Sequence, residues 1–253
     1  MSRLLAAYAA AAYLFLYLPL GILATFSFNS SKLSIWHGFT LEWYARVFQN
    51  QALLEGTINS LTIAMSATVV STLIGTLAAY AIWKKRSPLL ASSLFLSLLT
   101  PEIVTGVSLL AFFEWAFRFL HVRLGMHTVI LAHISFSLVY VVMVILARLR
   151  TFDPTLEEAA MDLGANEWQV FRRITLPMLL PGIIAAALLC FTVSFDDYVI
   201  TSLVAGVNSE TLPMMIYAMA RRGVSPEINA LSVMITAALG VFILLAGRFE
   251  QKS

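Results

Sequence analysis

The chain has 253 residues, of which 60% are hydrophobic and 12% are charged, whereas a typical soluble domain carries roughly 25% charged residues. This composition excludes an ordinary soluble domain and predicts a membrane protein whose core lies mostly in lipid. The net charge of +2 is weak evidence for an anionic partner, and no nucleic-acid partner is expected. The single cysteine, Cys190, excludes an intrachain disulfide.

Six apolar stretches reach about 20 residues, the length that crosses about 30 Å of hydrocarbon as a helix. In chain order they cover 4–26, 58–83, 89–117, 128–147, 181–205 and 230–247. The first follows Arg3 and is similar to a secretory signal. Its apolar run is too long, however, and no small-residue cleavage site follows Phe26, so we expect a retained anchor. Six spans place both termini on one side of the membrane.

The positive charges between the spans predict which side that is. One face carries Arg3, Lys84, Lys85, Arg86, Arg148, Arg150, Arg172, Arg173, Arg248 and Lys252, and the other carries Lys32, Arg46, Arg118, Arg123, Arg221 and Arg222. Cytoplasmic loops of membrane proteins are enriched in lysine and arginine. The first group and both termini are therefore expected in the cytoplasm.

Two short segments outside the spans favour helices at the outer surface. Thr40 is a suitable N-cap for an amphipathic segment over 41–48, in which Trp43 and Tyr44 would lie at headgroup depth. The second segment, 212–222, is followed by Gly223, a typical helix stop. Within the second span, small residues recur every four positions and predict close packing of two helices: Ala67, Ser71, Gly75 and Ala79.

Three carboxylates lie deep inside the spans, where an ionisable group costs about 2.5 to 3.5 kcal/mol on insertion scales. Glu102 and Asp196 are predicted at a similar depth, roughly 20 Å from the cytoplasmic edge at 1.5 Å per residue. Asp197 is adjacent to Asp196 and hence about 100° around the helix from it. Pro101 leaves the carbonyl of Ser97 without its helical donor, so the third span should bend beside Glu102.

Acids of this kind favour a pathway for a cationic solute. Ser194 and Tyr198 supply polar groups nearby, and Trp43, Tyr198 and Tyr217 are candidate aromatic surfaces for methylene groups. Alternatively, the acids pair with helix-terminal donors or with an arginine of a partner, and the aromatic residues are interfacial anchors or core. Arg221 is a candidate gate, although a cation at a helix C-terminus, favoured by the dipole, is the preferred interpretation.

No catalytic or cofactor-binding constellation is apparent. His133, Ser135 and Ser137 face different ways on a helix, which favours a packing histidine. No His/Cys/Glu cluster has metal-ligand spacing, and no glycine-rich loop ends in Gly-Lys-Ser/Thr, so no ATP site of that type is expected. The chain is not expected to be an enzyme, and energy for any transport must come from another subunit.

The most polar long segment, 148–180, reads as a helix, a tight turn and a second short helix. Asp153 before Pro154 predicts a helix start, and Gly164 predicts its end. Asn166 and Gln169 have the spacing of a capping box that begins the next helix. Ala159 and Ala160 give the first helix a smooth face, although an ordinary cytoplasmic loop is the simpler alternative.

This segment resembles the EAA loop of the membrane subunits of ABC importers. Glu158-Ala159-Ala160, then Gly164, then Ile174, Leu176 and Pro177 stand at the spacing of that loop. Further stretches at 28–31, 101–104, 195–197 and 223–230 extend the similarity over nearly the whole chain, to the second type of permease subunit in spermidine/putrescine importers. The resemblance implies a type I ABC importer permease fold and a single transmembrane permease domain over 1–253.

The resemblance also implies partners and a location. In that family the loop is a coupling helix that docks on a cytoplasmic ATPase, which implies this role for Glu157, Glu158, Ala159, Ala160, Asp162 and Gly164. ATP and Mg would belong to a homodimeric ATPase. A second, homologous permease, an external polyamine-binding protein and the bacterial inner membrane complete the implied assembly. Its alternating access would be coupled to ATP hydrolysis.

Two other functions stay open at the level of sequence. The same architecture could import another solute, such as an amino-acid-like compound, an opine or an aminophosphonate. An intramembrane hydrolase using Glu102, Asp196 and Asp197 is the more distant alternative, because adjacent aspartates on one helix cannot readily share a water as a catalytic dyad does.

Overall fold

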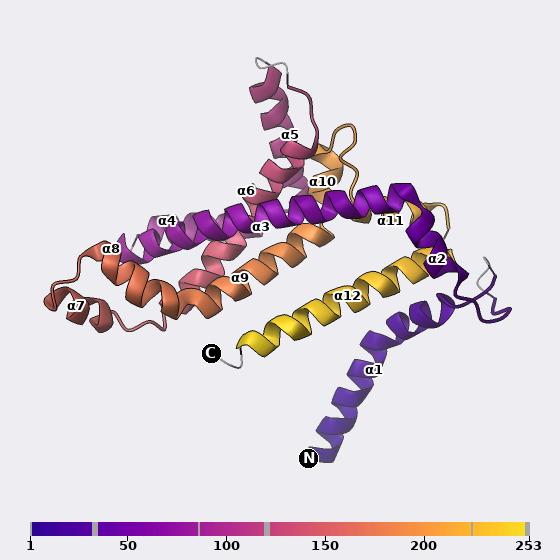
Figure 1. The fold of residues 1–253 in the computed structure, drawn as a ribbon, viewed down its shortest axis with the longest axis horizontal. Coiled ribbons are helices and arrows are strands. Elements are labelled where there is room, and N and C mark those ends of the chain that lie inside the picture. Colours follow the sequence, from indigo (N-terminus) through magenta and orange to yellow (C-terminus); the bar gives the residue numbers. More distant parts are fainter. Residues whose placement is uncertain (1, 32–34, 86, 119–121, 224, 251–253) are drawn as a thin grey trace. The chain divides into compact units, whose positions relative to one another are not determined.

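A computed structural model describes all residues except 1, 32–34, 86, 119–121, 224 and 251–253. Every regular element in the described part of the chain is a helix (Figure 1), and the one β-bridge there joins Asn29 to Phe39. The predicted all-α class is confirmed.

The chain divides into two compact units, which are described separately. The first comprises 1–55 and 215–253 and contains α1 (Ser2–Phe26), α2 (Glu42–Gln49) and α12 (Pro226–Glu250). Within it, α12 packs against both α1 and α2. The helix predicted after Thr40 is thus confirmed, and the Thr40 hydroxyl accepts a hydrogen bond from the Glu42 amide at 3.2 Å.

The second unit comprises 56–214 and holds most of the remaining helices. They are α3 (Gln51–Lys85), α4 (Pro88–Leu99), α5 (Glu102–Arg118), α6 (Met126–Leu149), α7 (Thr155–Asp162), α8 (Glu167–Val170), the π-helix η1 (Phe171–Thr175), α9 (Leu176–Asp196) and α10 (Val199–Val204). α3 and α11 (Leu212–Arg221) each begin in one unit and end in the other. Helix α6 is central, because α4, α5, α9 and α10 all pack against it.

The small-residue stripe on α3 allows a close helix crossing, as predicted. Ala67, Ser71 and Ala79 are fully buried, and a Cβ added to Gly75 would stand 2.7 Å from Val141 Cγ1 on α6. The Ser71 hydroxyl donates to the Ile134 carbonyl of α6 at 3.2 Å. Because the side chains of this stripe are small or absent, the two backbones gain dispersion contacts that larger residues would prevent.

Two apolar clusters lie along α6. One contains Val129 and Ala132 near the start of the helix, together with Phe113 from α5. The other contains Val141 and Ile145 in its second half. His133 and Ser137 are buried polar residues between them in the sequence, so the helix carries polar groups at the middle of an otherwise apolar surface.

The number of spanning helices is only partly settled. Four described helices are long and apolar enough to cross a membrane: Leu4–Phe26, Gln51–Lys85, Met126–Leu149 and Glu167–Asp196. A fifth is obtained when α4 and α5 count as one broken span. In α12 the apolar part within the described side chains, Pro226–Val241, is shorter. The arrangement of six spans with cytoplasmic termini stays a prediction.

Two of the expected spans are interrupted. The stretch 89–117 is bent by 102° between α4 and α5, which confirms the bend predicted at Pro101. The carbonyl of Ser97 is not left free, however, because it accepts the Thr100 amide at 3.4 Å. The stretch 181–205, expected as one helix, is instead α9 and α10, with Asp197 and Tyr198 outside both.

Candidate functional site

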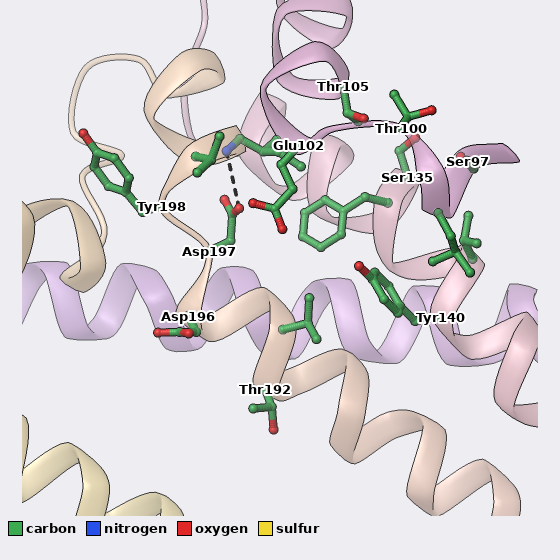
Figure 2. A pocket seen from close by; sticks show the side chains of 16 residues that line it. Ser97, Thr100, Glu102, Thr105, Ser135, Tyr140, Thr192, Asp196, Asp197 and Tyr198 are labelled. Atoms are coloured by element: carbon green, nitrogen blue, oxygen red, sulfur yellow. Dashed lines mark hydrogen bonds between the residues drawn. The ribbon is translucent and has the colours of Figure 1, made fainter. Parts of the chain in front are cut away.

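Both helix breaks border one pocket, with a volume of about 470 Å³. The first break supplies Thr100 and Glu102, and the second supplies Asp196, Asp197 and Tyr198 (Figure 2). Helix α6 closes one side with Ser135 and Tyr140. Irregular backbone within a membrane protein is tolerated where protein or a polar cavity surrounds it, and this pocket provides such a setting for both breaks.

The pocket brings together the three acids that the sequence singled out. Glu102 and Asp196 are exposed, and neither has a hydrogen-bond or ion-pair partner among the described residues. Figure 2 shows the carboxylates of Glu102 and Asp197 turned toward each other. No lysine or arginine is found among the described residues that line the pocket, so its charge is negative.

The prediction that Asp196 and Asp197 lie about 100° apart on one helix is wrong, because α9 ends at Asp196. Asp197 has an extended backbone, and its carboxylate caps α10 instead. Its Oδ1 accepts the Ile200 amide at 3.3 Å, and its Oδ2 accepts the Thr201 amide at 2.8 Å. The alternative left open by the sequence, in which an acid pairs with donors at a helix terminus, is therefore confirmed for Asp197.

The ends of four helices strengthen the preference for cations. The last residues of α4 and α9 line the pocket, and a helix C-terminus carries a partial negative charge. At the N-termini of α5 and α10, Glu102 and Asp197 offset the partial positive charge that would otherwise oppose a cation. The helix ends and the side chains of the pocket thus both favour a positively charged ligand.

His133, which the sequence analysis interpreted as a packing histidine, lies near this pocket and has polar partners that were not predicted. Its ring is 1% exposed. Its Nδ1 lies 2.7 Å from the Ser194 hydroxyl, and its Nε2 lies 2.9 Å from the Thr201 hydroxyl. A histidine within an apolar span needs polar partners. This requirement was the only indication in the sequence that His133 forms hydrogen bonds. The partners are 61 and 68 residues away, so no local pattern could reveal them.

The remaining aromatic candidates and the possible gate belong to the other unit. Trp43 is 4% exposed, and its indole N–H donates to the Asn29 carbonyl at 2.7 Å. The Arg221 guanidinium lies 4.9 Å from the centre of the Tyr217 ring, in the last turn of α11. These contacts give Trp43 and Arg221 structural roles. Their roles in a pathway or gate, and that of Tyr217, stay predictions.

The first helix, the turn and the capping box of the segment 148–180 have the local structure that the sequence predicts. Thr155 donates to Asp153 Oδ1 from its amide and its hydroxyl, at 3.0 and 2.8 Å, and these bonds lower the pKa of the Asp153 carboxyl. Gly164 follows α7 with φ +90°, a conformation that other residues adopt only at a cost. The capping box between Asn166 and Gln169 is present.

The second helix of this segment is not a separate short helix. α8 continues through η1 into α9, so that Glu167–Asp196 forms one long helix. The π-helical turn between them is a local widening that can re-aim side chains, and it contains Thr175, which is fully buried and faces α7. The polar loop is therefore joined directly to a helix long enough to span a membrane.

Glu157 holds α7 against the ends of α3 and η1. Its side chain is 2% exposed. Lys84 Nζ lies 2.6 Å from Oε2, and the hydroxyls of Thr175 and Tyr80 donate to Oε1 at 2.6 and 3.3 Å. Burial alone would raise the pKa of the Glu157 carboxyl, but the hydrogen bonds from Lys84 and Thr175 outweigh it and hold the pKa below its usual value.

The rest of α7 presents its side chains outward. Glu158, Ala159 and Asp162 are exposed, and Ala160 is half-buried. Leu163, at the end of the helix, is 90% exposed. Of the two adjacent glutamates, Glu157 is thus turned inward and Glu158 is available to a partner, a distinction that the sequence did not make.

Relatives of known activity share this chain over most of its length. The spermidine/putrescine transport system permease protein PotC of Haemophilus influenzae is 41% identical over 237 residues, which cover 92% of this chain and 91% of the relative. The putrescine transport system permease protein PotI of Escherichia coli is 42% identical over 241 residues, covering 92% and 86%. These relatives are transport permeases and not enzymes, which contradicts the hydrolase alternative.

Solved structures and a family model agree with the architecture. The crystal structure of a bacterial alginate ABC transporter, in complex with a periplasmic protein that carries an alginate pentasaccharide, contains a chain with TM-score 0.77 and 18% identity. The match covers 99% of this chain and 93% of that one. Residues 71–251 match the model of the binding-protein-dependent transport system inner membrane component. The chain therefore belongs to this family of inner-membrane transport permeases.

Proposed function

We propose that this chain is the permease subunit of an ATP-driven importer for polyamines of the spermidine and putrescine class. The observation that carries the proposal is the pocket, in which Glu102 and Asp196 have no partner among the described residues and no lysine or arginine opposes them. An ammonium group is attracted to unpaired carboxylates in a site of reduced dielectric constant. The names of PotC and PotI point to the same class of solute.

The pocket suits a flexible chain that carries several ammonium groups. Glu102 begins α5 and Asp196 ends α9, so two ammonium groups of one molecule have acceptors on separate helices. Tyr140 and Tyr198 also line the pocket, and aromatic faces bind methylene groups and cations alike. Each ammonium group of the polyamine would pair with one carboxylate as the solute moves between the acids.

The proposed importer needs three further components. We expect a second, homologous permease, a homodimeric cytoplasmic ATPase that binds ATP and Mg, and an external protein that delivers the polyamine. In this arrangement both termini and 148–180 lie in the cytoplasm, and α7 docks on the ATPase through Glu158, Ala159 and Asp162. Closure of the ATPase would move α7, and with it α3 and α9, because Glu157 ties α7 to Lys84 and Thr175.

An amino-acid-like compound, an opine or an aminophosphonate is the second candidate class of solute. Each carries a carboxylate or phosphonate group, which requires a cationic or amide donor in the site. The described pocket residues include three carboxylates and no basic side chain. This charge pattern favours the polyamine.

Uptake by the reconstituted complex tests the choice of solute. Proteoliposomes containing both permeases and the ATPase would receive radiolabelled spermidine or putrescine on the external protein. We expect Glu102→Gln and Asp196→Asn each to reduce uptake by about tenfold, the effect of losing one charge-assisted hydrogen bond. Glu114→Gln on α5, an exposed acid outside this pocket, is the matched control. Unchanged uptake in both pocket variants would exclude the acidic pathway.

Copurification tests the coupling role independently of the solute. Glu158→Lys reverses an exposed charge on α7, and Gly164→Pro replaces a residue with φ +90° by one restricted to negative φ. Both changes should release the ATPase from the purified permease. If both variants kept the ATPase bound, the assignment of α7 as the docking element would be wrong.

A further inference from the structure

A chain of hydrogen bonds runs from α9 through His133 to Asp197. Ser194 on α9 meets Nδ1 of the ring, and Thr201 on α10 meets Nε2. The Thr201 hydroxyl also lies 2.7 Å from Asp197 Oδ2. Ser194, Thr201 and His133 are each no more than 3% exposed, so water does not replace these bonds.

Donor and acceptor chemistry gives this chain one direction. The Asp197 carboxylate only accepts, so the single hydroxyl hydrogen of Thr201 points to Oδ2 and its oxygen accepts from His133. Nε2 therefore carries the hydrogen. Nδ1 lies 2.7 Å from the Ser194 hydroxyl, so every group in the chain has a partner. This assignment follows from the hydrogen-bond pattern.

The pattern leaves Asp197 with part of its capacity unused. A carboxylate has about four acceptor positions. The Ile200 amide occupies one on Oδ1, and the Thr201 amide and hydroxyl occupy two on Oδ2. One position on Oδ1 remains, and Figure 2 shows this carboxylate turned toward Glu102.

We propose that His133 is a positioning residue for the transport pathway. It joins α6 to both sides of the break between α9 and α10, and so holds the Asp197 carboxylate opposite Glu102 for a passing ammonium group. The inference rests on the proposed polyamine importer and deepens it. His133 itself does not line the pocket. It acts on Asp197 through the Thr201 hydroxyl and through the direct approach of Nε2 to Oδ2 at 3.5 Å.

Uptake measurements on the assembled complex separate this role from simple packing. His133→Leu should lower maximal spermidine uptake by about tenfold, the effect expected when a bond to a charged group is lost. His133 is only 1% exposed, so the external protein cannot contact it. The concentration of loaded external protein that gives the half-maximal rate should therefore stay unchanged. His133→Gln places an amide donor near the Nε2 position and should restore most of the uptake.

The decisive comparison combines His133→Leu with Asp197→Asn. If His133 acts through Asp197, the double variant transports as slowly as Asp197→Asn alone. Losses that multiply would show that His133 acts independently and would overturn the inference. So would unchanged uptake in His133→Leu.

Two further variants keep the test decisive. His127→Leu makes the same exchange at an exposed position of α6 and should transport normally. Should His133→Leu fail to assemble, Thr201→Val removes the hydroxyl that bridges His133 and Asp197, at nearly constant volume, and takes its place in the comparison. A wild-type complex that imports no polyamine would refute the proposed function itself, whereas normal transport by the variants refutes only the role of His133.

Discussion

The ion pair between Glu157 and Lys84 predicts an unequal response to removal of either partner. Lys84 Nζ and Glu157 Oε2 are 2.6 Å apart, but the lysine side chain is 41% exposed and the glutamate side chain only 2%. After Glu157→Gln, water can solvate the remaining ammonium group. After Lys84→Met, the carboxylate stays buried with only the hydroxyls of Thr175 and Tyr80 as donors.

The free energies of unfolding of the two variants should therefore differ by more than the error of the measurement. For Glu157→Gln we expect a loss of about 1 to 2 kcal/mol, because the hydrogen bond is charge-assisted but half of the pair is already hydrated. For Lys84→Met we expect about 3 kcal/mol, the lower end for an uncompensated buried charge, because Thr175 and Tyr80 still donate. Glu158→Gln, an exposed neighbour, should change stability by less than about 0.5 kcal/mol.

The pH dependence distinguishes an ionic anchor from simple packing. The pKa of Glu157 is lowered in the folded protein, so its contribution is complete above the unfolded-state value, about 4.3 for glutamate. It is lost as the pH falls through the lower folded value. In Lys84→Met, burial is no longer opposed by the ammonium group, so the pKa of Glu157 rises. Acidification should then reduce the stability difference between Lys84→Met and the wild type.

Hydrogen exchange over residues 155–175 in nanodiscs measures this local stability directly. Exchange should increase in the order Glu158→Gln, Glu157→Gln, Lys84→Met, and the last difference should shrink at low pH. Equal exchange in Glu157→Gln and Lys84→Met, or a pH-independent difference, would refute the argument from unequal burial.

Three further substitutions test the packing that supports the sites. For each, we would measure the thermal midpoint of the purified permease and one further property, named below. Gly164→Ala adds a methyl group that meets no atom within 4 Å, but alanine adopts the left-handed backbone at φ +90° only at a cost. We therefore expect a loss of about 1 to 2 kcal/mol and weaker ATPase copurification; normal binding would contradict it. Gly206→Ala makes a Cβ collide with the backbone carbonyl of Leu124, which approaches Gly206 closely between α5 and α6. Little folded protein should therefore be recovered, and a normal yield would show that this approach is looser than described. Trp43→Phe removes the indole N–H that donates to the Asn29 carbonyl at 2.7 Å and should cost about 1 kcal/mol, the net contribution of one hydrogen bond. The loss should be seen as faster proteolysis within 27–50, whereas wild-type cleavage would show that the bond is dispensable.

Local chemistry made several features predictable. A proline has no amide hydrogen and glycine tolerates positive φ, so the bend at Pro101 and the turn at Gly164 could be located from single residues. The capping box at Asn166 depends on a spacing of three residues. The stripe on α3 depends on helical periodicity alone.

One local feature was nevertheless missed. The Asp197 carboxylate accepts from amides only three and four residues further on, but 181–205 was taken as one apolar span, so the break between α9 and α10 was not expected.

Other features depend on residues far apart in the chain. Two adjacent glutamates look alike in the sequence. Glu157 becomes the inward one only because Lys84 and Thr175 meet it from α3 and η1.

The sequence by itself determined the membrane class, the all-helical architecture, the polar loop with its turn, and the acids that needed an explanation, since each follows from composition or from neighbours within a few residues. The tertiary structure alone decided that Glu102, Asp196 and Asp197 share a pocket and that His133 joins Ser194 and Thr201 across more than 60 residues. Hydrogen bonds act over about 3 Å, and only folding brings such distant groups within that range.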